Sequence, residues 1–374
     1  MQSFGLNRLL FCSFVLIGCL LEGAVAAANL CEADRERWQC LDRLPSFQEP
    51  LAHPLIGQVY DARSPSAVHD MCPGRALNRL VQSLRTEVSQ PYPAGDGPRF
   101  LVLGEMHDNP AHHILRAELL RSIFSDRPGQ TPPLKAPAII FEHIQAGQQE
   151  AVDAVTAGAG SQPLPEVVNQ LFAALSWKTS GWPDQKLFEP LFSIALETHM
   201  PILAGNAPSA IVNKISAEGF DALPVAERKR FRRTGRLSPA LRDALLSELE
   251  ASHCGLLPKV RFKKMAIAQR YRDSHLALAL SDAGARTGSA VLLAGNGHAR
   301  KDRGVPSFFG HQGLQGKPIS VMLIEVEDGR NDAQDYVPMD PNGEPAADFI
   351  IFTPGADRKD PCIEMRSRFS KPKE

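Results

Sequence analysis

The sequence FLVLGEMHDN occupies residues 100–109 and contains an apolar run, a glycine and a group of polar side chains. A second run, Val291–Ala294, continues in the same way into Gly295-Asn296-Gly297-His298. Compact apolar runs are typical of strands buried on both faces of a parallel sheet. Ligands of open α/β sheets bind outside the carboxyl ends of the strands. We therefore expect these two motifs, far apart in sequence, to meet in one crevice.

Other apolar runs recur along the chain, with helix-like stretches between them. They are Leu55–Tyr60, Ala138–Phe141, Ile202–Ala204, Ile319–Val326 and Phe349–Phe352. This alternation predicts an α/β fold with a mainly parallel sheet flanked by helices.

The predicted domain spans residues 27–366, followed by a polar tail over 367–374. Two intervals within it, at about 147–199 and 208–285, are longer than a simple crossover needs. We expect these insertions to form a smaller helical domain.

The composition of the chain does not indicate a particular class of binding partner. The chain has 374 residues and a formal net charge of −1, so no overall field attracts it to nucleic acid. The main basic run is 228–233, and it is interpreted either as a solvated helix face or as an anion-binding patch.

The first 26 residues resemble an export signal. Arg8 provides the positive charge, Leu9–Leu21 the apolar core, and Ala24-Val25-Ala26 a cleavage site. This favours a periplasmic location. Leu16-Ile17-Gly18-Cys19 supports an alternative, because it resembles a lipobox and would make the protein an outer-membrane lipoprotein through Cys19.

An oxidising compartment would permit disulfides. Cys31 and Cys40 are close in sequence and form a natural pair. Pairing among Cys72, Cys254 and Cys362 stays open, because spacing alone does not define it.

Carboxylates and imidazoles stand at the predicted strand ends. Glu105 and His107 are two residues apart, so on an extended segment their side chains point the same way. Glu142 follows another apolar run, and His298 ends the second motif. We expect Glu105, His107, Glu142 and His298 to form a catalytic cluster, with Glu105, His107 and His298 as ligands of a divalent metal ion.

Neighbouring residues have structural alternatives. Asp108 or Asn109 is expected to cap the next helix, with Pro110 at its first position. Gln269 and Asp273 lie one helical turn apart and would share a face, either solvated or turned towards the crevice. The sequence contains no Gly-x-Ser-x-Gly elbow, no Walker loop and no His-Glu-x-x-His motif.

Short motifs in a fixed order resemble the ChaN-like haem-binding proteins of bacterial iron uptake. They are Gly104–Asn109, Phe141-Glu142, Trp177–Pro183, Gly205–Pro208, Ala268-Gln269 with Asp273, Gly295–His298, Gly304–Pro306 and Asp360–Cys362. The family is distantly related to Tiki-type and erythromycin-esterase-type proteins, which use such Glu/His strand ends for hydrolysis.

The resemblance implies a haem-loaded homodimer at the outer membrane, served by a haem receptor. It also implies that a tyrosine ligates the iron, while histidine and lysine of the other subunit bind the propionates. Lys178 is expected to bind a propionate and Trp182 to stack on the porphyrin. Phe188 stands where a tyrosine is expected, which leaves Tyr271 as the candidate iron ligand. Haem binding is thus the leading functional hypothesis, and a metal-dependent hydrolase is the alternative.

Overall fold

The computed structural model describes residues 53–64, 73–89, 97–125, 136–160, 162–234, 236–309 and 314–369. The predicted signal segment, Cys19, the Cys31–Cys40 pair and Cys72 lie outside these residues. So does the end of the predicted polar tail, whose first residues, 367–369, belong to a helix.

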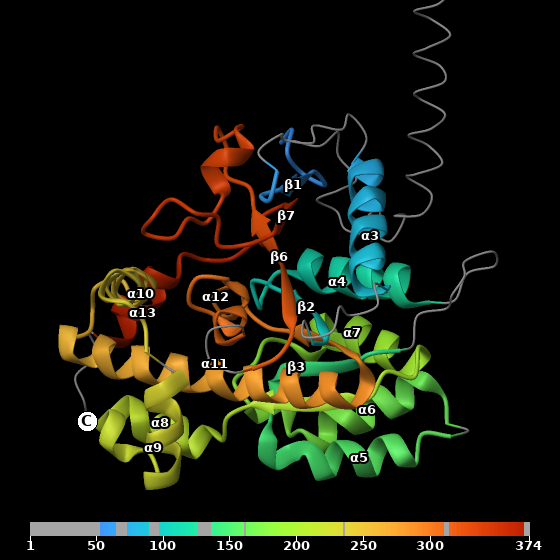
Figure 1. Ribbon diagram of the computed structural model, residues 1–374, viewed down its shortest axis with the longest axis horizontal. Coiled ribbons are helices and arrows are strands. Elements are labelled where there is room, and N and C mark those ends of the chain that lie inside the picture. The colour runs from blue at the N-terminus through green and yellow to red at the C-terminus, as the bar shows by residue number, and fades with distance from the viewer. Residues whose placement is uncertain are drawn as a thin grey trace, which may run out of the picture.

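One seven-stranded sheet forms the centre of the protein (Figure 1). Its spatial order is β1-β7-β6-β2-β5-β3-β4. Neighbouring strands are parallel except for β1, which runs antiparallel to β7 at one edge. The predicted α/β fold is confirmed. The strands are β1 (Val59–Asp61), β2 (Arg99–Leu103), β3 (Ala138–Gln145), β4 (Ile202–Asn206), β5 (Ser289–Leu293), β6 (Lys317–Glu325) and β7 (Phe349–Thr353).

One face of the sheet is covered by five helices, which share its larger apolar core. They are α3 (Pro73–Ser89), α4 (Pro110–Phe124), α5 (Gln149–Ala157), α6 (Leu164–Ala174) and α7 (Gln185–Glu197). The structure therefore differs from the expectation for the interval 147–199. Leu171, Phe188 and Phe192 are buried in the core of the sheet, so this interval covers the sheet and is not part of a separate helical unit.

The other face is covered mainly by the C-terminal half of α11 (Lys259–Thr287), through Leu276, Ala277 and Leu280. The N-terminal half of α11 extends beyond the sheet, where α8 (Ser209–Glu218), α9 (Val225–Thr234) and α10 (Pro239–Ser252) lie beside it (Figure 1). We call these three helices and the first half of α11 the helical lobe. It has its own small apolar cluster around Phe231 and Tyr271.

A disulfide links the helical lobe to the C-terminal helix that the structure describes. Cys254, just after α10, is bonded to Cys362 in α13 (Pro361–Phe369), with their Cα atoms 5.7 Å apart. Cysteine spacing could not predict this pair, because 108 positions separate the two residues. Within the described residues, no helix combines the length and hydrophobicity needed to span a membrane.

The strand order explains where polar residues converge. Strand β5 lies between β2 and β3, and β4 follows β3. Because these four strands are parallel, their carboxyl ends are neighbours at one edge of the sheet. Residues following β2 and β5 are thereby brought beside residues of β3 and β4.

Candidate functional site

The first motif is fixed by the start of α4. Asn109 is the N-cap, since its Oδ1 accepts from the Ala111 N–H at 2.8 Å, and Pro110 is the first helical residue. The Asn109 amide also donates to the Pro354 carbonyl at 2.9 Å. The Asp108 side chain does not cap α4 and instead forms an ion pair with Arg358 at 2.8 Å. Of the two cap candidates, the structure therefore selects Asn109.

His112 is a structural residue. Its Nδ1 accepts from the Met106 N–H at 2.8 Å, so the proton is on Nε2, which donates to Thr353 Oγ1 at 2.8 Å. Burial lowers the pKa of His112 to about 3, so the ring is neutral. His112 thus ties the first motif to β7.

The two glycine-containing motifs touch each other directly. A Cβ on Gly104 would overlap the side chain of Asn296, and a Cβ on Gly295 would lie 3.0 Å from His107 Nε2. The Asn296 N–H donates to the Glu105 carbonyl at 2.9 Å. The missing side chain of glycine permits this close approach, most strictly at Gly104 and less so at Gly295.

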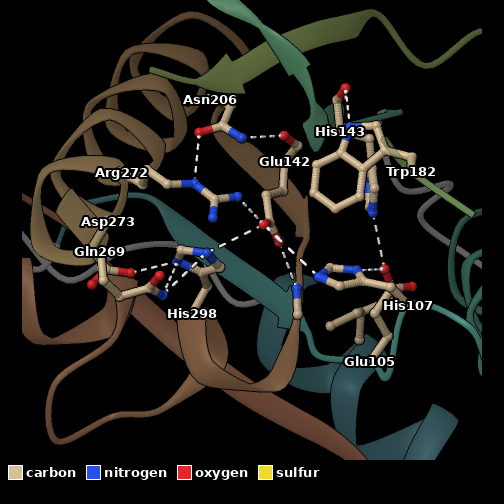
Figure 2. A network of polar contacts seen from close by, with 12 residues as sticks. Glu105, His107, Glu142, His143, Trp182, Asn206, Gln269, Arg272, Asp273 and His298 are labelled. Carbon is tan, nitrogen blue, oxygen red and sulfur yellow. Dashed lines mark hydrogen bonds and ion pairs between the residues drawn. The ribbon is translucent and has the colours of Figure 1, made fainter. Parts of the chain in front are cut away.

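The polar cluster at the strand ends has two halves, one around Glu105 and the other around Glu142 (Figure 2). Glu105, the centre of the first half, is only 1% exposed. Its Oε1 accepts from His107 Nδ1–H at 2.6 Å and from His143 Nε2–H at 2.9 Å. Its Oε2 forms an ion pair with Arg116 of α4, which is also fully buried. A buried carboxylate is costly without such a partner, so Arg116 is what allows Glu105 to be ionised there.

The histidines around Glu105 are neutral. His113 Nε2–H donates to the His107 carbonyl at 2.9 Å, while its Nδ1 accepts from Arg116 at 3.0 Å. Burial lowers the pKa of His113 to about 4, and burial also lowers the pKa values of His107 and His143. His107 donates from Nδ1, so its Nε2 carries a lone pair. The His107 side chain is 35% exposed, which makes it the accessible base of this half.

Glu142 is the centre of the second half, and it is also 1% exposed. Its Oε2 accepts from the Gly295 N–H at 2.7 Å, and its Oε1 lies 3.2 Å from His298 Nε2. Arg272 of α11 forms an ion pair with the same Oε1. Burial opposes ionisation, but the charges of His298 and Arg272 outweigh it and keep the pKa of Glu142 well below its usual range.

His298 joins Glu142 to Asp273. Its Nδ1 lies 2.6 Å from Asp273 Oδ1, so each ring nitrogen faces a carboxylate. Burial opposes the charged form, but these two carboxylates raise the pKa of His298 to about 9. At neutral pH His298 is therefore an imidazolium whose two N–H groups each face a carboxylate. His298 does not belong to the group of Glu105, His107 and His143 that could hold an ion, and its role as a metal ligand stays a prediction.

The two halves face each other across a short gap (Figure 2). His107 Nε2 and Glu142 Oε1 are 4.0 Å apart, too far for a direct hydrogen bond. A water-sized group between them could contact both atoms. The gap is too narrow for a porphyrin ring to enter between these two atoms.

Glu105, His107 and His143 could offer one ligand atom each to a metal ion, all within 4.8 Å of one another. Imidazole and carboxylate are ordinary ligands for Zn²⁺. The donor set nevertheless fits a divalent ion poorly. Glu105 is already neutralised by Arg116, and its Oε1 accepts hydrogen bonds from N–H groups of both imidazoles.

The residues expected to bind haem lie in two separate places. Trp182 is half-buried beside the cluster: its ring is 4.9 Å from His107, and its indole N–H donates to the His143 carbonyl at 3.1 Å. Lys178 is exposed in the short helix Trp177–Thr179. Tyr271 is remote from both, in the core of the helical lobe.

Tyr271 does not suit the role of iron ligand. It has no exposed surface, and its hydroxyl donates to Glu227. Phe188 is also fully buried, with its ring 4.2 Å from His113 and 4.7 Å from Trp177. A tyrosine at position 188 would therefore point into the core, and this position would not present an iron ligand to solvent.

Three charged or titratable partners in the cluster were not among the site residues predicted from the sequence. His143 was hidden because β3 continues to Gln145, so Glu142 and His143 point to opposite faces of the strand. Arg116 lies three residues after His113 among the buried residues of α4, and a charge at an otherwise apolar helical spacing with Leu115, Leu119 and Leu120 was the available signal. Arg272 precedes Asp273, and nothing in its sequence context marked it.

Comparison with known proteins places this chain in a family. A profile described as "Haem-binding uptake, Tiki superfamily, ChaN" matches residues 96–309. Among curated proteins, no similar sequence was found.

One solved structure has a similar fold. ChaN of Campylobacter jejuni, whose structure is described as "Cofacial heme binding", has a TM-score of 0.55 at 17% identity. The match covers 78% of this chain and 94% of that one, and it establishes a shared fold.

Two further solved structures are less similar. The type III effector HopBA1 has a TM-score of 0.34 at 10% identity, over 74% of this chain and 94% of the effector. A Bacillus cereus protein has a TM-score of 0.28 at 12% identity, over 67% and 75%. Since the profile covers more than half of its residues, this chain belongs to the ChaN family of haem-binding uptake proteins in the Tiki superfamily.

Proposed function

We propose that this protein binds haem and serves bacterial haem-iron uptake in the periplasm or at the outer membrane. The observation that carries the proposal is membership of the haem-binding family over residues 96–309. Heme binding in the Campylobacter jejuni structure is described as cofacial, which favours two haems stacked between two copies of the chain.

The segment 177–183 is the proposed haem contact. Trp182 offers an aromatic face for a porphyrin, and the exposed ammonium of Lys178 can pair with a propionate. Both residues lie between α6 and α7 and retain exposed surface. The described tyrosines are not accessible in the same way, since Tyr60, Tyr271 and Tyr336 are 6%, 0% and 7% exposed. Tyr92 lies outside the described residues.

Haemin titration of the mature protein tests the proposal. We expect a saturable shift of the Soret absorption, and a weaker affinity in Lys178→Ala because a charged contact to a propionate is lost. Lys214→Ala, an exposed lysine of α8, is the matched control and should bind as the unchanged protein does. Absence of any saturable shift would exclude haem binding, whereas equal affinity in Lys178→Ala would remove only that residue from the site.

Oligomeric state and location are tested separately. Sedimentation of the protein with and without haemin should show a dimer only in the loaded state. Mass spectrometry of the mature N-terminus distinguishes cleavage after Ala26 from a lipidated Cys19. Either processing would support export, and an intact Met1 would contradict it.

A hydrolase is the second candidate, and one observation favours it. The lone pair of His107 Nε2 faces the Glu142 carboxylate across 4.0 Å, where a water could be bound and deprotonated. Glu105 would orient the base, and Arg272 could stabilise developing negative charge. Screening with chromogenic esters, with and without a chelator, tests this. Activity lost in His107→Ala would support it, and sensitivity to the chelator would show whether a metal takes part.

A further inference from the structure

The helical lobe contains a cavity of about 800 Å³ that is distinct from the strand-end cluster. Its walls come from α9, the following loop, α10 and the first half of α11. It is lined by Phe231, Arg236, Leu237, Arg242, Asp243, Leu245, Leu246, Lys263, Ala266, Ile267 and Arg270. Its volume is within the range of pockets that bind small molecules.

The lining combines an apolar interior with positive charge. Phe231, Leu245 and Ala266 are buried apolar side chains, while Lys263 and Arg236 are exposed. The lining carries four basic side chains and one acidic one, although the whole chain has a net charge of −1. The lining of the cavity thus has an excess of positive charge that the chain as a whole does not have.

These cations differ in how far they are neutralised. Arg242 pairs with the neighbouring Asp243 at 3.1 Å, and both are largely exposed. Within the described part of the chain, Lys263 and Arg236 form no ion pair or hydrogen bond. They are thus available to an anion.

The deep end of the cavity is closed by Arg270, which is only 3% exposed. Its Nη1 lies 3.4 Å from Asp273 Oδ2, and the other oxygen of Asp273 contacts His298. Arg270 and Asp273 therefore separate the cavity from the strand-end cluster, and the two sites share no exposed group.

The walls are held in place without a ligand. The Cys254–Cys362 disulfide anchors the end of α10 to α13, which lie together in Figure 1. Glu248 of α10 also forms an ion pair with Arg303, in the loop after α12 (Asn296–Ala299). A preformed cavity loses less conformational freedom on binding than a flexible one.

We propose that the lobe cavity binds an amphipathic carboxylate, with its apolar body between α10 and α11 and its carboxylate at Lys263 and Arg236. An apolar interior matches the body of such a ligand, and unpaired cations match its head group. The proposal is independent of the haem contact at Lys178 and Trp182. Both a long-chain fatty acid and haem itself have the required chemistry.

Fluorescence titration of the mature protein with dansylated undecanoic acid tests the site. Binding should be saturable, and about tenfold weaker in Lys263→Glu, because a charged contact becomes a repulsion. Ile267→Trp should weaken it similarly by filling the cavity. Lys214→Glu, which makes the same charge change on α8, is the control and should leave the affinity unchanged. Thermal unfolding of each variant verifies that the lobe is folded.

Competition identifies the source of the carboxylate. Displacement of the probe by oleate, and not by haemin, would identify a fatty-acid site. Displacement by haemin, with haem affinity also reduced in Lys263→Glu, would identify a haem site in the lobe. Binding that does not saturate, or equal affinity in Lys263→Glu, Ile267→Trp and the unchanged protein, would overturn the proposal. Haemin titration of Lys178→Ala gives the separate result for the proposed haem contact.

Discussion

Glu105 and Glu142 are equally buried, yet the protein compensates their charges in different ways. Glu105 is neutralised by one fully buried cation, Arg116, and its histidines are neutral. Glu142 is neutralised by an imidazolium and by Arg272, whose side chain is 23% exposed. Two similar strand ends therefore produce different electrostatic environments.

The difference follows from what each carboxylate faces. Glu105 points towards α4 and the aromatic core, where burial keeps imidazoles neutral. Glu142 points towards α11, where Asp273 adds a second negative charge beside His298. A second carboxylate is what makes the imidazolium stable. The first half consequently presents a neutral base, His107, while the second half is a closed network of ions.

The largest expected effect comes from breaking the first half. Arg116→Met removes the buried cation and leaves Glu105 unpaired, so unfolding should become easier by about 3–5 kcal/mol. Urea denaturation measures the change. Arg121→Met is the matched control in the same helix, since its pairs are exposed and should be worth about 0–1 kcal/mol. Similar losses in both variants would show that Arg116 is not essential to Glu105.

The second half of the cluster should make the free energy of unfolding depend on pH. The pKa of His298 is raised from 6.5 to about 9 by folding, so its contribution is complete below pH 6.5 and is lost as the pH rises through 9. The contribution would be roughly 3 kcal/mol at most. Urea unfolding followed from about pH 6 to about pH 10 should show this decline.

Replacing the imidazole isolates its contribution. His298→Gln should be less stable near neutral pH and should lose the decline, whereas His253→Gln in the helical lobe should retain it. An unchanged pH profile in His298→Gln would assign the decline to other groups.

The smallest stability effect is expected at the accessible base. His107→Ala removes one hydrogen bond from a side chain that is 35% exposed, so the cost should be about 1 kcal/mol. His143→Ala, which removes a fully buried ring beside Trp182 and Phe188, should cost about 2–4 kcal/mol. If both substitutions cost the same, His107 would be a structural residue and the contrast between the halves would weaken.

Much of the architecture could be predicted because the strands carry a local signal. Each of the seven apolar runs overlaps a strand, and glycine followed by a polar residue correctly marked the ends of β2 and β5. The extent of the helical lobe could not be predicted in this way. Helical spacing shows that a segment is amphipathic but not which surface it covers, and residues 147–199 cover the sheet.

The sequence predicted which residues come together in the candidate site, but not which partners each of them contacts. Glu105, His107, Glu142 and His298 do converge, because β5 inserts between β2 and β3. Their protonation states depend on partners from other elements: Arg116 on α4, and Asp273 and Arg272 on α11. The position of Tyr271 likewise depends on the packing of α9 against α11.

The sequence by itself determined the sheet, the glycine turns and the set of polar groups at the strand ends, because apolar runs and missing side chains act locally. Only the tertiary structure decided which imidazole is charged, which is neutral and which tyrosine is buried. Those properties depend on distance to other charges and on exclusion of water, and both are set by segments distant in sequence.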